Sequence, residues 1–302
     1  MDSAAKKFKK QNRKRHWFQL AYAAVTNGYV AGYLNGTIYK GNLKYACVPG
    51  LNCYSCPGAL GSCPIGSLQA VLGSRDYSFS YYVVGFLLAF GAVLGRVVCG
   101  FLCPFGFVQD LLYKIPFGKK LRGLPGDKVL RYLKYVILAA FVVLLPMLAL
   151  DVIGQGQPWF CKYVCPSGTL FAGLPLVLTN QSLQSAVGGL FAWKVGLMLL
   201  ILVLCIPVYR PFCRYLCPLG AIYGLFNPVA LYRYRVDASA CTRCKACEKS
   251  CPMAVATYLT PNSPECIRCG VCRRVCPTGA IHSTLEPKST PSPKKKGARY
   301  DG

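Results

Sequence analysis

The sequence predicts an α-helical integral membrane protein with a small cysteine-rich domain at its C-terminus. Two observations predict this class. Of the 302 residues, 54% are hydrophobic and only 15% are charged, a composition too apolar for an ordinary soluble domain. Eight of the nineteen cysteines also fall in the last quarter of the chain, in two runs with the same internal spacing.

Four apolar stretches are each about long enough to cross a bilayer core, which takes roughly 20 helical residues. They are about Trp17–Leu34, Tyr77–Val98, Leu130–Leu150 and Gly188–Val208. Asn27 and Gly28 interrupt the first stretch, and no small-residue cleavage site follows it, so we expect a span and not a signal peptide. The alternative is that these stretches are core helices of a soluble protein. The pattern predicts a four-helix membrane core over residues 17–230, flanked by a basic N-terminus (1–16) and a C-terminal domain (231–283).

The net charge of +25 is concentrated on one side of the predicted membrane core. The basic residues before the first span and between spans two and three are Lys6, Lys7, Lys9, Lys10, Arg13, Lys14, Arg15, Lys114, Lys119, Lys120, Arg122 and Lys128. The positive-inside rule therefore predicts a multi-pass protein of the bacterial cytoplasmic membrane with both termini in the cytoplasm. This placement favours anionic lipid over nucleic acid as the partner of the basic N-terminus. The Pro-, Ser- and Lys-rich tail, 284–302, is expected to be disordered.

Each C-terminal cysteine run reads C-x2-C-x2-C-x3-C-P, the spacing of bacterial ferredoxins that hold two [4Fe–4S] clusters. In that arrangement the fourth cysteine of each run ligates the other cluster. We expect one cluster on Cys241, Cys244, Cys247 and Cys276, and a second on Cys266, Cys269, Cys272 and Cys251. The alternative of zinc knuckles or disulfides is disfavoured because zinc sites place a longer gap between C-x2-C pairs.

An internal repeat relates the two halves of the membrane core. Arg96–Gly106 (RVVCGFLCPFG) matches Arg210–Gly220 (RPFCRYLCPLG), and Cys63–Leu68 matches Cys165–Leu170. Each half reads as a span, an outer Cys-Pro-x-Gly turn, a second span and an inner Arg-x-x-Cys-x-x-x-Cys-Pro turn, which predicts a pseudo-twofold core. Each inner turn supplies two thiolates one helical turn apart. Together the two turns predict one inner membrane cluster on Cys99, Cys103, Cys213 and Cys217.

Two arginines precede the inner cysteines, and they have two interpretations. Arg96 and Arg210 could be fixed cations that raise the reduction potential of the inner cluster. They could equally be side chains that snorkel to the membrane interface. No catalytic residue is expected, because no nucleophile–base pair stands out.

The predicted outer loops hold six further cysteines, and their ligand set stays open. The repeat favours an outer cluster on Cys56, Cys63, Cys161 and Cys165, with Cys47 and Cys53 as alternative ligands. In a second arrangement Cys47, Cys53, Cys56 and Cys63 hold a cluster by themselves. Any pair without iron can form a disulfide on the oxidising side. Cys205, inside the fourth span, is expected to be an ordinary buried thiol.

As a set, these motifs resemble the NapH/NosR/CcoG-type membrane polyferredoxins, and the resemblance covers Trp17 to His282. It implies that the chain moves electrons between a quinol or cytoplasmic donor and an extracytoplasmic redox system. NapH-type members are described as quinol-oxidising partners of periplasmic nitrate reductase. The resemblance thus implies an electron-transfer subunit of an oxidoreductase system, with quinol dehydrogenase as one form.

Absent motifs narrow the chemistry further. The two histidines, His16 and His282, lie outside the predicted spans, which excludes a bis-histidine haem in the membrane. Neither a G-x-G-x-x-G fingerprint nor a P-loop is present, which disfavours a tightly held dinucleotide or nucleoside triphosphate.

The expected function is an electron conduit with about four [4Fe–4S] clusters. Its partners would be a cytoplasmic donor such as ferredoxin and an extracytoplasmic redox protein, with a flavin-bearing protein as one form. Because a bilayer core is about 30 Å thick, we expect re-entrant turns, or else a quinone or flavin that bridges the gap. A quinone site is one use for the aromatic residues Tyr77, Phe79, Tyr81 and Tyr82. The alternatives are a metal reductase or assembly factor that binds soft metal at Cys47 and Cys53, and a redox-sensing regulator.

Overall fold

The computed structural model describes residues 2–74, 80–116, 118, 120–149, 151 and 155–285, with side chains from residue 12 on except residue 80. Lys119 and the predicted disordered tail beyond residue 285 lie outside the described residues. So do Tyr77 and Phe79 of the predicted aromatic cluster.

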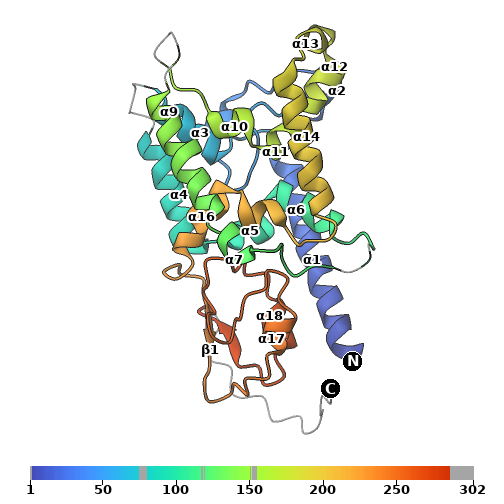
Figure 1. Cartoon of the computed structure of the whole chain (residues 1–302), viewed down its shortest axis with the longest axis vertical. Helices are drawn as coiled ribbons and strands as arrows, with labels where there is room; N and C mark the ends of the chain where they lie inside the picture. Colours follow the sequence, from blue (N-terminus) through green and yellow to red (C-terminus); the bar gives the residue numbers. More distant parts are fainter. Residues whose placement is uncertain are drawn as a thin grey trace.

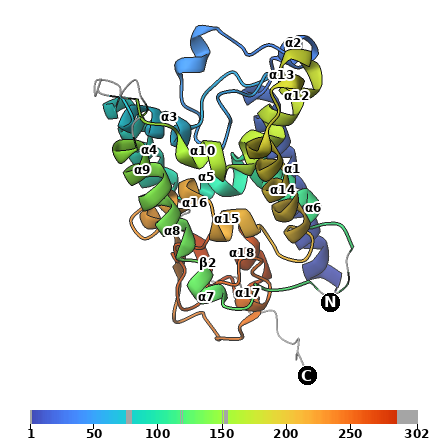
Figure 2. The same cartoon turned by 45° about the horizontal axis from the view of Figure 1, so that its top comes forward.

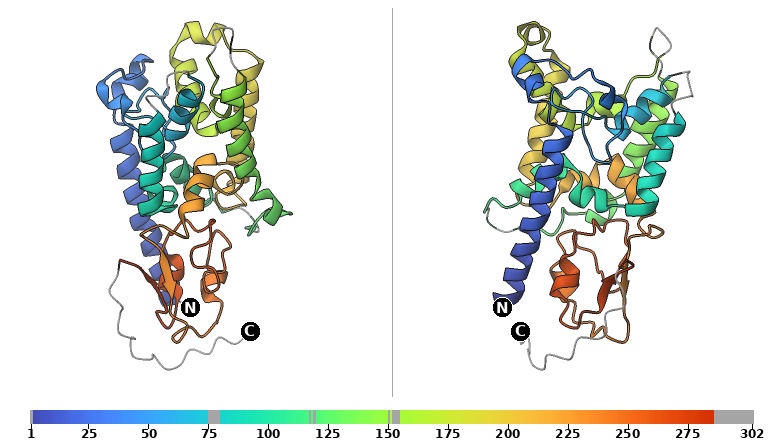
Figure 3. Two further views of the ribbon diagram at one scale, coloured as in Figure 1. Left: turned by 90° about the vertical axis from the view of Figure 1, so that its left-hand side faces the viewer. Right: turned by 180° about the vertical axis from the view of Figure 1, so that it is seen from behind.

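Four long helical stretches run side by side along the longest axis of the molecule (Figure 1). They are α1 (Asp2–Thr26), α4 (Ser80–Leu94), the joined helices α7 (Asp127–Leu130), α8 (Leu133–Ile137) and α9 (Leu145–Leu148), and α14 (Gly189–Leu204). One such stretch lies in or beside each of the four predicted spans. The N-terminus and the C-terminal domain lie at the same end of this bundle (Figures 1 and 3), the end to which the positive-inside rule assigns both.

Shorter helices fill the space between the long ones and form both ends of the bundle (Figure 2). In the first half these are α2 (Val30–Asn35), η1 (Asn42–Tyr45), α3 (Pro64–Leu72), α5 (Val97–Phe101) and α6 (Pro104–Leu112). In the second half they are α10 (Trp159–Tyr163), α11 (Pro166–Gly168), η4 (Thr169–Gly173), α12 (Leu174–Thr179), α13 (Gln181–Ser185), α15 (Pro211–Tyr215) and α16 (Pro218–Phe226). The element order therefore repeats as the sequence predicts: long helix, outer short helix, long helix, then two inner short helices.

The first predicted span is not one helix. α1 ends at Thr26 and α2 begins at Val30. The Ala23 carbonyl accepts both the backbone N–H of Asn27 at 3.0 Å and its side-chain amide at 3.1 Å, so Asn27 binds back onto the last turn of α1. The chain then turns, and the Tyr29 N–H donates to the Gly58 carbonyl of the outer loop at 3.2 Å. The prediction of a single helix over Trp17–Leu34 is wrong for this reason.

In the described part of the chain, two helical stretches contain π-helical segments, and each segment is followed by a proline. η3 (Leu138–Leu144) lies two residues before Pro146, and η4 (Thr169–Gly173) lies two residues before Pro175. Proline lacks an N–H and crowds the carbonyl four residues earlier. Local widening to a π turn lets the helix pass the proline.

Among the described residues, only Asp127–Leu148 forms a helical stretch long and apolar enough to cross a membrane. Three shorter apolar helices accompany it, Tyr81–Leu94, Pro166–Thr179 and Gly189–Leu204. Large apolar side chains project outward from the long helices, among them Leu88 on α4, Leu148 on α9 and Leu199 on α14. The apolar outer surface is the feature that the membrane prediction leads one to expect.

The C-terminal domain is closed by a two-stranded antiparallel sheet, β1 (Tyr234–Val236) and β2 (Ile281–Ser283), with Tyr234 opposite Ser283. Between the strands lie α17 (Ala246–Lys249) and α18 (Val271–Val275). Helix α18 packs on α1, and α1 in turn packs on α5 and α6. The N-terminal helix therefore connects the C-terminal domain to the inner end of the bundle.

Candidate metal centres

Four Cys-Pro-x-Gly turns form the framework of two sites inside the bundle. In each, a cysteine is the N-cap residue and proline is the first helical residue, where its missing N–H costs nothing. These N-caps are Cys63 of α3, Cys103 of α6, Cys165 of α11 and Cys217 of α16. In the last three, the sulfur accepts the backbone N–H of the glycine three residues later, at 3.4, 3.4 and 3.3 Å. Each turn thus aims a helix N-terminus at a sulfur, which favours a negatively charged thiolate.

The four cysteines predicted for the inner site lie together and are buried. They are Cys99 on α5, Cys103, Cys213 on α15 and Cys217. The Cys217 thiol interacts electrostatically with the other three, and Cys103 and Cys213 each interact with Cys99. The structure therefore brings the predicted set together, while ligation of a cluster stays a prediction.

Arg96 and Arg210 each form a hydrogen bond to the inner turn of the other half of the chain. Arg96 Nη2 donates to the Cys213 carbonyl at 2.9 Å, and Arg210 Nη1 donates to the Cys99 carbonyl. Each arginine thus holds the backbone of the cysteine that belongs to the other half. Both side chains are 0% exposed, so the interpretation as snorkelling side chains is wrong.

Each of these arginines has a buried acidic partner that the sequence analysis did not identify. Arg210 Nε lies 2.7 Å from Asp110 Oδ1 of α6, and Arg15 of α1 also contacts this carboxylate at 2.9 Å. Arg96 Nη1 lies 3.1 Å from Glu265 Oε2 of the C-terminal domain, and Lys134 of α8 pairs with the same carboxylate. Burial would raise the pKa of Glu265, but Arg96 and Lys134 hold that pKa below its ordinary value.

The C-terminal domain is docked on the inner site through its backbone as well. Asn227 Nδ2 donates to the carbonyls of Ser263 and Cys266, at 2.9 and 2.8 Å. A Cβ placed on Gly100 would lie 2.6 Å from the Ile267 carbonyl oxygen, so the two backbones touch and only glycine fits. The residues next to Cys99 and Cys266 are therefore in direct contact.

Glu265→Ala should destabilise the docked arrangement by about 3–5 kcal/mol, the range for removing one partner from a buried ion pair. The change leaves the cations of Arg96 and Lys134 buried without their counter-ion. Thermal unfolding and the rate of trypsin cleavage at Arg233, in the linker before β1, measure the effect.

Glu248→Ala is the matched control for this change. Glu248 also neighbours a cysteine predicted to hold a cluster, Cys247, but lies on α17 outside the ion-pair network. Equal destabilisation by both variants would contradict the docking role of Glu265.

The cysteines of the C-terminal domain fall into the two sets that the spacing predicts. Cys241, Cys244, Cys247 and Cys276 line one small cavity. In the second set, the Cys272 thiol interacts electrostatically with Cys266, Cys269 and Cys251. Cys269 also belongs to the apolar core that contains the inner site, whereas Cys244 is exposed to solvent. The second set is therefore next to the bundle, and the first faces outward.

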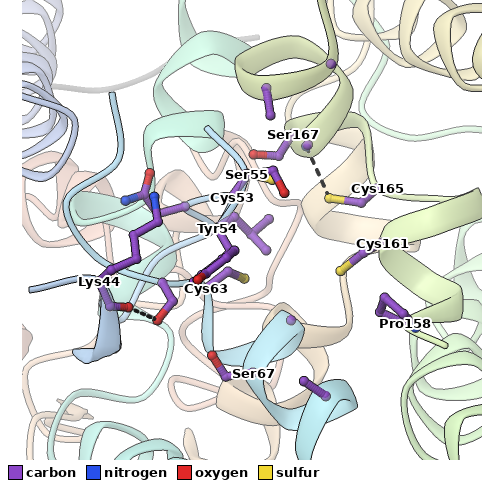
Figure 4. Close-up of a pocket in the computed structure, with 18 of the residues that line it drawn as sticks. Lys44, Cys53, Tyr54, Ser55, Cys63, Ser67, Pro158, Cys161, Cys165 and Ser167 are labelled. Atoms are coloured by element: carbon purple, nitrogen blue, oxygen red, sulfur yellow. Dashed lines mark hydrogen bonds between the residues drawn. The ribbon is translucent and has the colours of Figure 1, made fainter. Parts of the chain in front are cut away.

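A cavity of about 640 Å³ at the other end of the bundle is lined by four cysteines. They are Cys53 of the outer loop, Cys63, Cys161 of α10 and Cys165, and their side chains face a common space (Figure 4). A Cβ on Gly168 would lie 3.5 Å from Cys53 Sγ and 3.8 Å from Cys165 Sγ. Lys44 and Lys194 also line the cavity, and such cations offset the negative charge of a thiolate-bound cluster.

The structure places Cys53, not Cys56, in this cavity. Cys56 is fully buried beside it, where its sulfur lies 3.0 Å from the Tyr33 hydroxyl of α2 and 3.7 Å from Asn27 Oδ1. Cys47 does not line the cavity either, and its thiol lies 3.8 Å from Ser67 Oγ. Three residues of the favoured set, Cys63, Cys161 and Cys165, line the cavity, and Cys53 lines it in place of Cys56. The ligands of an outer cluster stay a prediction. Of the four cysteines of the second arrangement, Cys53 and Cys63 line the cavity and Cys47 and Cys56 do not.

The spacing Cys161-x-x-x-Cys165-Pro repeats that of the two inner motifs. This signal was present in the sequence and places both residues in one site. Among the described residues, no three Cys, His, Asp or Glu side chains converge closely enough to hold a single metal ion. The outer set and the first set of the C-terminal domain instead line cavities, an arrangement that suits the corners of a polynuclear cluster.

The outer loop extends into the bundle and contacts the inner turn around Cys103. A Cβ on Gly50 would lie 3.1 Å from Cys103 Cα and closer still to the Leu102 carbonyl oxygen. The neighbouring Pro49 carbonyl accepts the Tyr223 hydroxyl of α16 at 3.1 Å. Only two residues, Leu51 and Asn52, separate Gly50 from Cys53.

Two of the residues predicted for a quinone site, Tyr81 and Tyr82, lie in the described part of the chain. Tyr81 is 82% exposed, and the Tyr82 hydroxyl accepts the Cys47 backbone N–H at 3.2 Å. That site stays a prediction.

Comparisons with known proteins match the cysteine motifs directly. A family model described as "4Fe-4S binding domain" matches residues 79–125, 135–176 and 190–232, and another with that description matches 261–282. Each of the first three matches contains one Cys-x-x-x-Cys-Pro motif. No solved structure matches the chain.

The curated relatives include ferredoxin-type proteins. An uncharacterized protein of Methanocaldococcus jannaschii is 34% identical over 54% of this chain and 61% of its own length. The methylamine utilization ferredoxin-type protein MauN of Paracoccus denitrificans is 28% identical over 77% of this chain and 72% of its own. The ferredoxin-type protein NapH of Haemophilus influenzae is 26% identical over 80% and 76%. The chain spans 61% and 57% of the first two relatives, both from Methanocaldococcus jannaschii.

Proposed function

We propose, from the premise that this chain belongs to the NapH-type polyferredoxins, that it carries electrons across a cytoplasmic membrane through four [4Fe–4S] clusters. When bound, such clusters accept and release single electrons. The proposed donor is a cytoplasmic ferredoxin-like protein or a quinol, and the proposed acceptor is an extracytoplasmic redox protein.

One observation carries this proposal: the C-terminal domain with its two sets of cysteines, α5 with the inner set and α10 with the outer set follow one another along the long axis of the molecule (Figure 1). The set around exposed Cys244 suits electron entry, and the set around Cys269 adjoins the bundle. The inner set touches it through Gly100 and Ile267. The set around Cys53 lies at the far end.

The contact between the outer loop and the inner turn shortens the distance that electrons would have to cross within the membrane. A single transfer across about 30 Å of hydrocarbon would be inefficient. Gly50 lies against Cys103, and the cysteines Cys63 and Cys165 belong to the same apolar core as Cys99. Irregular backbone at membrane depth is tolerated where protein surrounds it. This supports a direct route without a bridging quinone or flavin.

The proposed membrane core consists of α1, α4 with α5, α7 to α9, and α14. Helix α4 has 15 residues and α14 has 16, so each is roughly 22–24 Å long at 1.5 Å per residue. These lengths fall short of a full bilayer core, and the adjoining inner turns complete each crossing. The outward-facing apolar side chains on these helices support contact with lipid.

The metal-handling alternative needs Cys47 and Cys53 at one site. Of these two residues, only Cys53 lines the outer cavity. A regulator needs one cluster, whereas the described residues group sixteen cysteines into four sets. An electron conduit would use all four sets of cysteines.

Iron and acid-labile sulfide in anaerobically purified protein test the proposal. We expect about sixteen iron atoms per chain, because each [4Fe–4S] cluster uses four cysteines, and four distinct signals in the EPR spectra of the reduced protein. About twelve would leave one membrane site without iron. About eight would confine iron to the C-terminal domain and reject the transmembrane route.

A further inference from the structure

Two fully buried glutamines donate hydrogen bonds to cysteine sulfurs, one in each membrane site. Gln69 Nε2 lies 3.3 Å from Cys161 Sγ, and Gln109 Nε2 lies 3.1 Å from Cys213 Sγ. Both glutamines are 0% exposed. Neither residue has a role in the route described above.

The two contacts are equivalent by position. Gln69 follows Cys63 by six residues on α3, and Gln109 follows Cys103 by six residues on α6. Each amide reaches the first cysteine of a Cys-x-x-x-Cys-Pro motif in the other half of the chain. The same position after the remaining two Cys-Pro cysteines holds Phe171 and Tyr223, so each site receives one amide.

Neighbouring groups fix which end of each amide faces the sulfur. Gln69 Oε1 accepts the Phe160 backbone N–H at 2.9 Å, a group that can only donate. Gln109 Nε2 lies 3.5 Å from the Phe105 carbonyl, a group that can only accept. The Cys205 thiol, 3.9 Å away, donates to Gln109 Oε1. The nitrogen therefore points at the sulfur in both sites.

A simpler explanation is that each glutamine only returns to its own helix. Both amides do reach the carbonyl four residues earlier, that of Ile65 or Phe105. That bond uses one of the two amide hydrogens, and the other is directed at a thiol in both sites. A buried amide in an apolar core needs such partners, and leucine would fill the same space without that requirement.

We propose that Gln69 and Gln109 set the reduction potentials of the outer and inner clusters. A hydrogen bond to a ligating sulfur withdraws negative charge from it, which stabilises the reduced state and raises the potential. The inference rests on the proposed function, because it requires clusters at both membrane sites. Because each membrane site has its own glutamine, the reduction potential of each cluster would be set independently of the other.

Potentiometric titration monitored by EPR tests this inference in the full-length protein. Gln109→Leu should shift the midpoint potential of the inner cluster to more negative values and leave the other clusters unchanged. Gln69→Leu should do the same for the outer cluster alone. The inner signal is identified by its loss in Cys217→Ala, and the outer signal by its loss in Cys165→Ala.

Gln19→Leu is the matched control. Gln19 is also buried, at 1% exposure, but its amide donates to the Gly100 carbonyl at 3.0 Å and to no sulfur. It should leave all potentials in place. A full iron content with unchanged potentials in Gln109→Leu and Gln69→Leu would overturn the tuning role and leave the conduit standing. Absence of iron from the membrane sites of the unmodified protein would overturn both.

A second measurement does not depend on the folding of any variant. With glutamine side chains labelled with ¹⁵N, pulsed EPR of the reduced unmodified protein should show weak ¹⁵N coupling on both membrane-site signals. Spectra without such coupling would reject the amide–sulfur contacts.

Discussion

Cys217→Ala is expected to lower the iron content by about four atoms per chain, the content of one [4Fe–4S] cluster. Cys217 caps α16, and its thiol interacts with all three other inner cysteines. Three thiolates on two turns leave one corner of the cluster without its ligand. One EPR signal should vanish, and electron transfer from the reduced C-terminal domain to an acceptor beyond the outer cavity should stop.

Cys205→Ala is the control for this change. Cys205 is a fully buried cysteine near the same site, but its thiol donates to Gln109 and lies outside the motif. It should keep the full iron content and all signals. Equal loss of iron in Cys205→Ala and Cys217→Ala would mean that the inner set is wrongly assigned. Full iron content in Cys217→Ala would mean that the inner turns hold no cluster.

The sequence made the inner site predictable because the same motif occurs twice. One turn with Cys99 and Cys103 offers two thiols, and the second copy supplies the other two at the same end of the bundle. The repeat thus fixes both the residues and their approximate position. The C-terminal sets were predictable for the same kind of reason, since eight cysteines in a ferredoxin spacing leave little freedom.

The charged partners of the inner site could not be predicted from the sequence. Glu265 lies 169 residues from Arg96, and Asp110 lies 100 residues from Arg210. Nothing local to either arginine indicates which carboxylate will reach it. Only the docking of the C-terminal domain on α5, and the approach of the start of α15 to α6, brings these groups together. The sequence alone therefore cannot decide whether these arginines are fixed cations beside a cluster or snorkelling side chains. Their burial decides against snorkelling.

The end of the first helix before Asn27 and Gly28 was only partly predictable from the sequence. Asn27 and Gly28 interrupt the apolar stretch, and the helix does end there. The hydrophobic run on either side is long enough to suggest one helix. The capping bond of Asn27 to Ala23 and the contact with the outer loop decide against it.

The outer site was the least predictable, because one of its four cysteines comes from an irregular loop. Cys53 and Cys56 are three residues apart in a segment without helical or strand periodicity. Local spacing cannot choose between them. The choice is made by residues distant in sequence: Tyr33 and Asn27 engage Cys56, while α10 and α11 present Cys161 and Cys165 to Cys53.

Cys53→Ala and Cys56→Ala should therefore have opposite outcomes. Cys53→Ala removes one of the four thiols that line the outer cavity, and we expect about four fewer iron atoms per chain. Cys56→Ala removes a thiol that contacts Tyr33 and Asn27, so we expect full iron content and at most a modest loss of stability. Iron analysis and the EPR signal of the outer cluster separate the two.

This pair of variants also tests how the outer loop is folded. Both changes remove one sulfur from the same loop, so a general loosening of the loop would lower iron equally in both. If Cys56→Ala loses the cluster and Cys53→Ala keeps it, the ligand is Cys56, as the sequence favoured, and the loop must rearrange when the cluster forms. Loss in Cys53→Ala alone means that the thiol facing Cys63, Cys161 and Cys165 is the ligand. Contacts to α2 would then hold Cys56 away from the iron.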